Sequence, residues 1–120
     1  MSEPTVAETF AKQGTDWATW FRAVRRRSRR SRTKWLGSWE HSQFIMAHSE
    51  AIPDPERERA DHARILGAMN HLAELVDYLD TELRADPAYV PPPAVFGDLR
   101  ARLRAVLDLH PALQPLVLPA

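Results

Sequence analysis

The segment ILGAMNHLAELVDYLDTEL, residues 65–83, decides the fold, because its apolar residues recur at alternating intervals of four and three. This spacing puts them on one side of an α-helix and continues for about three heptads. We call this line of residues the seam. Its members are Ile65, Met69, Leu72, Val76, Leu79 and Leu83. The seam predicts a helix that packs along its length, either within a bundle of one chain or against a second copy in an oligomer.

The residues around the seam predict a helix over 55–85. Asp54 is suited to cap it, Pro55 to take its first position, and two glutamates follow at the positive end of the helix dipole. The Asp-Pro pair at 86–87 ends it.

A stiff linker over 86–93, which contains YVPPP, leads to a last helix over 94–109. The apolar residues of this last helix again recur at intervals of three and four. They are Phe96, Leu99, Leu103 and Val106.

The segment 17–49 is rich in arginine and tryptophan and predicts one helix, or two helices broken near Gly37. Six of its residues repeat the spacing of the seam, namely Trp17, Phe21, Val24, Ser28, Ser31 and Trp35. The two serines are small, and we expect them to let a neighbouring backbone approach closely. The side opposite this line carries a basic face, which consists of Arg22, Arg25, Arg26, Arg29, Arg30 and Lys34.

Together these patterns predict an all-α, single-domain bundle of three to four main helices. We expect a short N-terminal arm over 1–14, with a turn of helix near Val6 to Phe10, and an apolar, Pro-rich C-terminal tail over 110–120. Strands are not expected, because the chain has no run of alternating β-branched residues and no hairpin dipeptide.

The charge of the chain is balanced in total but concentrated along the sequence. Sixteen basic residues offset sixteen acidic ones, yet the window 22–34 alone carries eight basic residues and no acid. Such a segment binds an external polyanion or pairs with acidic groups inside the protein. The 55–85 helix offers acidic residues off the seam, among them Glu74, Asp77, Asp80 and Glu82. Only two of the sixteen basic residues are lysine. This bias toward arginine reflects either a need for guanidinium chemistry or a GC-rich genome.

Several classes of chemistry are disfavoured by composition. The chain has no cysteine, which excludes disulfides and thiol catalysis, and it has no apolar run of membrane-spanning length. Glu58 with His62, and His71 with Glu74, have the helical spacing of a ligand pair, but a complete metal site would need a second matched pair. We therefore expect a non-enzymatic, cytoplasmic protein without cofactor or metal and without a membrane partner.

Two functions remain open. In the first, the basic face binds the backbone of DNA or RNA, within an oligomer or a larger complex. In the second, the protein is an adaptor or assembly subunit whose basic face meets an acidic protein surface. The sequence does not decide between single and double strands.

Overall fold

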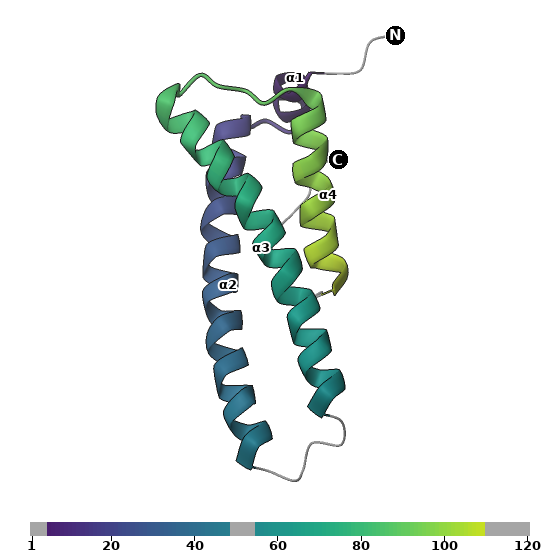
Figure 1. Cartoon of the computed structure of the whole chain (residues 1–120). Coiled ribbons are helices and arrows are strands. Elements are labelled where there is room, and N and C mark those ends of the chain that lie inside the picture. The colour runs from purple at the N-terminus through teal and green to yellow at the C-terminus, as the bar shows by residue number, and fades with distance from the viewer. Residues whose placement is uncertain (1–4, 49–54, 110–120) are drawn as a thin grey trace.

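Four helices follow one another along the chain and pack as an all-α bundle (Figure 1). The computed structural model describes residues 5–48 and 55–109, and it describes side chains for residues 5–37 and 56–109. The helices are α1, Val6–Lys12; α2, Trp17–His48; α3, Pro55–Ala85; and α4, Pro93–Leu109. The predicted all-α, single-domain bundle is confirmed. The predicted cap at Asp54 and the predicted tail over 110–120 lie outside the described residues.

Helix α1 shows that the predicted N-terminal arm is part of the core. Thr5 caps the helix, since its Oγ1 accepts a hydrogen bond from the backbone N–H of Glu8 at 3.1 Å. Gly14 follows the helix with a φ of 71°, a left-handed conformation that costs glycine little. Between these ends, Val6 and Phe10 turn toward the other helices and are buried. Apolar burial, which local sequence does not reveal, therefore extends the expected single turn of helix through Lys12.

Helix α2 begins where capping predicts and continues without interruption for 32 residues. Asp16 Oδ1 accepts a hydrogen bond from the N–H of Thr19 at 2.7 Å, which satisfies one of the free donors at the helix start. The alternative of a break near Gly37 is wrong. A single glycine inside a helix costs only about 1 kcal/mol relative to alanine, which tertiary packing readily offsets.

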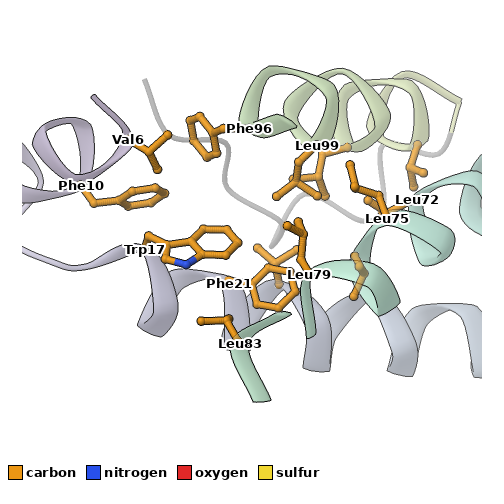
Figure 2. Close-up of a cluster of buried hydrophobic side chains, with 14 of the residues drawn as sticks. Val6, Phe10, Trp17, Phe21, Leu72, Leu75, Leu79, Leu83, Phe96 and Leu99 are labelled. Atoms are coloured by element: carbon orange, nitrogen blue, oxygen red, sulfur yellow. The ribbon is translucent and has the colours of Figure 1, made fainter. Parts of the chain in front are cut away.

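The core lies where all four helices meet (Figure 2). Phe10 of α1 packs edge-on against Phe96 of α4, with ring centroids 5.5 Å apart, and it also contacts Trp20 of α2 at 5.2 Å. Trp17 and Phe21 stack one turn apart at 4.8 Å. The aromatic residues therefore join the first two helices to α4, which is distant from them in sequence.

The linker between α3 and α4 is held by short-range and long-range hydrogen bonds. Asp86 accepts hydrogen bonds from the backbone N–H of Ala88, through its side chain, and of Tyr89, through its carbonyl. The indole N–H of Trp17 donates to the carbonyl oxygen of Tyr89 at 2.9 Å. This bond fixes the linker against the start of α2, a contact that the sequence does not predict.

Helices α2 and α3 run antiparallel, and α4 returns along only part of them (Figure 1). α4 packs chiefly on α3 and contributes Phe96, Leu99, Leu103 and Val106 to the core, as its spacing predicts. Because α4 ends partway down the bundle, the further portions of α2 and α3 have no third helix beside them among the described residues.

Candidate nucleic-acid interface

The basic face of α2 is divided by the structure into an inner edge and an outer face. The inner edge turns toward α3 and contains Arg25 and Arg29, with Arg32 beside them. The outer face, as we call it from here on, points away from α3. It consists of Arg22, Arg26, Arg30 and Lys34. At 100° per residue, these four positions follow one another around the solvent side of the helix.

Asp80 of α3 is the carboxylate that the arginines of the inner edge share. Its side chain is only 8% exposed, and it forms ion pairs with Arg25, with Arg29 at 3.7 Å and with Arg84 at 3.1 Å. A buried carboxylate is costly unless it is paired and hydrogen-bonded, and here three guanidinium groups share that task. The contact joins α2 to α3 across 55 residues of sequence.

The other inner-edge residues also bind α3. Arg29 donates to Asp77 Oδ1 at 3.2 Å, and the Nε of Arg32 donates to Asn70 Oδ1 at 2.8 Å. The predicted nucleic-acid-binding set therefore includes two residues, Arg25 and Arg29, that are already engaged inside the protein. For these two residues, the internal pairing anticipated from the acidic groups of α3 is what the structure contains.

The outer face differs from the inner edge in its exposure and its pairing. Its four side chains are exposed and form no ion pair within the part of the chain that the structure describes. They follow each other at intervals of four residues, so the row spans about 18 Å of helix axis. No acidic residue occurs between Trp17 and Trp39 to interrupt this positive surface.

A negative charge lies at the beginning of α2, before the first residue of the outer face. Hydrogen bonding to Thr19 holds the pKa of Asp16 below its ordinary value of 3.8, and the charge of Arg22 acts in the same direction. Asp16 is therefore an ionised helix cap beside the first residue of the outer face.

The seam of α3 is used inside one chain. Five of its six residues, from Met69 to Leu83, are buried in the core, and Ile65 is half-buried against it. The set proposed for self-association is thus the surface on which α2 and α4 pack. The heptad spacing identified the packing face of α3, but that face is covered without a second copy.

Ser28 and Ser31, on the apolar side of α2, do not lie against a neighbouring backbone as expected. Ser28 and Ser31 are half-buried and line a cavity of about 400 Å³ between α2, α3 and α4, with Met69, Leu72 and Val76 opposite them. The expectation was a close approach of a neighbouring backbone. Small side chains at two successive inward positions leave space here instead.

The histidine pairs do not form a metal site in the described region. His62 Nε2 lies 3.5 Å from Glu58 Oε2, and its ring stacks on Trp35 with centroids 4.7 Å apart. No group of three or more potential ligands lies together among the residues whose side chains are described. The side chains of His41, His48 and His110 lie outside those residues.

None of the helices, over the residues that the structure describes, combines the length and the apolar character that crossing a bilayer requires. The chain matches no family model, no curated protein and no solved structure. The charge and packing of the residues described above are therefore what bears on function.

Proposed function

We propose that the protein binds the sugar-phosphate backbone of nucleic acid through the outer face of α2, without catalysing a reaction. The observation that carries this proposal is a row of four exposed cations, at constant spacing on one helix, with no ion pair in the described structure. Like charges at intervals of four residues repel each other. A polyanion placed along the row removes that repulsion and gains four charge-assisted contacts.

The geometry favours binding without base recognition. A straight helix that presents guanidinium and ammonium groups contacts phosphate oxygens, which position a protein but do not encode sequence. The tryptophans whose positions are described lie on the inner side of α2, where Trp17 is buried and Trp20 and Trp35 pack against the core. They are therefore not arranged to stack on nucleic-acid bases.

Salt dependence provides the quantitative test. Four phosphate contacts predict that the logarithm of the binding constant falls with the logarithm of salt concentration at a slope of about −3.6 for duplex DNA and about −2.8 for single strands. We expect binding of a fluorescent oligonucleotide of arbitrary sequence at low salt, measured by anisotropy. No detectable binding at low salt would contradict the proposal.

Matched variants separate the outer face from general electrostatics. Replacing Arg22, Arg26 and Arg30 by glutamine removes three charges from the row and makes the slope less negative by about 2.7 for duplex DNA. The control removes the same charge from exposed positions on α3 and α4. It consists of glutamine at Arg59, Arg100 and Arg104. Equal losses in the two triple variants would show that net charge, rather than the outer face, is responsible.

The alternative is an adaptor whose outer face binds an acidic protein surface. The charge pattern serves both functions, but a regular row along 18 Å of helix suits a repeating polymer of charge better than a folded protein surface. Competition with polyglutamate distinguishes them. Displacement of the oligonucleotide by equal charge concentrations of polyglutamate favours the adaptor, and retention of the oligonucleotide favours nucleic acid.

A further inference from the structure

The cavity beside Ser28 and Ser31 has two chemically distinct parts. Its apolar part is formed by Met69, Leu72 and Val76 of α3 and by Val106 of α4, all of which are buried. Its polar part is formed by five side chains of α2 and by one residue of α3. The polar residues are Ser28, Ser31, Thr33, Arg29, Arg32 and Asp77. A volume of about 400 Å³ lies within the range of small-molecule sites, which combine an apolar lining with polar groups that fix the orientation of the ligand.

The charges around the cavity are unequal at its two ends. At one end Arg29 and Asp77 neutralise each other at 3.2 Å. At the other end Arg32 is half-buried, and within the described structure its only polar partner is the neutral amide of Asn70, which Nε contacts at 2.8 Å. A partly desolvated guanidinium without a carboxylate is unfavourable, and its terminal nitrogens remain available as donors.

Three hydroxyl groups of α2 line the cavity, and one of them is a further available donor. Ser28 donates to the carbonyl of Arg25 at 3.1 Å, and Thr33 donates to the carbonyl of Arg29 at 2.9 Å, so both are engaged by the helix itself. The hydroxyl of Ser31 makes no hydrogen bond with any described residue. Ser31 and Arg32 both line the cavity, so α2 presents a neutral donor and a cationic donor to the same space.

The size of the cavity limits the kind of occupant. Its lining extends over residues 28–33 of α2 and 69–77 of α3, which correspond to about 8 Å and about 12 Å of helix axis. A docked helix or a second copy of the chain would need a longer groove and a total interface on the order of 1,200 Å² or more. The cavity fits a short chain with one charged end instead.

We propose that this cavity binds a small amphipathic anion, with its apolar part on Met69, Leu72, Val76 and Val106 and its carboxylate or related headgroup on Arg32 and Ser31. Such a ligand supplies the carboxylate partner that Arg32 lacks among the described residues. The site is separate from the outer face of α2, so the proposal goes beyond nucleic-acid binding and does not depend on it.

Octanoate is a suitable probe, because it joins a short alkyl chain to one carboxylate. We expect it to shift the methyl signal of Met69 saturably in the full-length protein labelled with ¹³C at the methionine methyl groups. Met69→Leu assigns that signal. Acetate has the charge without the chain, and octanol has the chain without the charge, so both should bind at least about tenfold more weakly.

Three variants test the location and the charge. Arg32→Gln should weaken octanoate about tenfold to a hundredfold, whereas Arg30→Gln, with the same charge change on the outer face, should stay within about twofold. Ser31→Phe fills the cavity and should abolish binding, with the helical circular dichroism retained as the check on folding. Oligonucleotide binding should be unchanged by Ser31→Phe, which keeps the two proposals distinguishable.

Four results would overturn the proposal. They are a Met69 signal that does not respond to octanoate, an equal response to acetate, equal weakening by Arg32→Gln and Arg30→Gln, and undiminished binding to folded Ser31→Phe.

Discussion

Asp80→Asn tests the packing of α2 on α3 most directly, because it preserves the shape of the side chain and removes its charge. Exposed ion pairs contribute about 0.2–1 kcal/mol, and loss of one partner from a fully buried pair costs about 3–5 kcal/mol. Asp80 is 8% exposed and Arg25 is 28% exposed at the side chain, so the contact lies between these limits. We expect the substitution to lower the free energy of unfolding by about 2–3 kcal/mol.

The assay is thermal unfolding followed by circular dichroism. For a domain of 120 residues, 1 kcal/mol corresponds to about 4 °C, so Asp80→Asn should lower the midpoint by about 8–12 °C. Asp77→Asn is the matched control, because its side chain is 68% exposed although it also pairs with an arginine. We expect the control to cost no more than about 0.5 kcal/mol.

The reasoning is refuted if the two variants lose the same stability, or if Asp80→Asn is as stable as the native chain. A further variant separates lost pairing from lost packing. Replacing Arg25 by Met and Asp80 by Leu together removes both charges while keeping apolar volume, and such exchanges are often neutral or stabilising. The double variant should therefore unfold at a higher temperature than Asp80→Asn.

Phe10→Ala should lower the free energy of unfolding by about 3–5 kcal/mol in a denaturant titration, since Phe10 is fully buried; a loss below about 1 kcal/mol would show that α1 is not part of the core. Gly37→Ala should raise stability by about 0.5–1 kcal/mol, because an added Cβ meets no atom within 4 Å and alanine favours a helix; destabilisation would instead support a break there. Ser31→Leu should raise the unfolding midpoint by filling the cavity, with a gain of about 0.5–2 kcal/mol, and a lower midpoint would mean that the cavity does not accept a side chain. Asp16→Asn retains a good cap and removes the charge whose pKa is depressed in the folded protein. The ionised form stabilises the native chain above the ordinary pKa of 3.8, and this contribution is lost as pH falls through the folded value. The stability advantage of the native chain over Asp16→Asn at neutral pH should therefore disappear in acid, and an advantage independent of pH would contradict the assignment.

Periodicity predicted most of the fold because the bundle is built from long helices. The seam of α3 and the apolar residues of α4 are buried as their spacing requires, and the ends of α3 follow its proline and its terminal Asp-Pro pair. Helix α1 was harder to predict, since seven residues contain too few turns to reveal a face. The burial of Phe10 depends on its contacts with Trp20 on the next helix and with Phe96, which is distant in sequence.

The sequence predicts the basic face of α2 but not its division into an inner edge and an outer face. Helical position separates Arg22 and Arg30 from the apolar side, and the structure places them on the solvent side. Whether Arg25 meets solvent or Asp80 depends on the rotation and height of α3 relative to α2. The rotation and height of α3 depend on tertiary packing, so the local sequence pattern does not predict them. The cavity could not be predicted for the same reason, because small residues such as Ser28 and Ser31 are compatible with either close contact or empty space.

The contact between Arg25 and Asp80 also bears on the register of the two helices. A slide of α3 by one heptad leaves an apolar residue at four of the six seam positions. The slide replaces Leu72, Val76, Leu79 and Leu83 by Ile65, Met69, Leu72 and Val76. Apolar packing alone therefore distinguishes these alignments poorly. The same slide puts Ala73 or, in the other direction, Pro87 in place of Asp80, and Arg25 then loses its carboxylate. The buried charge thus makes one alignment of α2 and α3 preferable to its neighbours, in the way that a polar residue in a coiled coil selects one pairing.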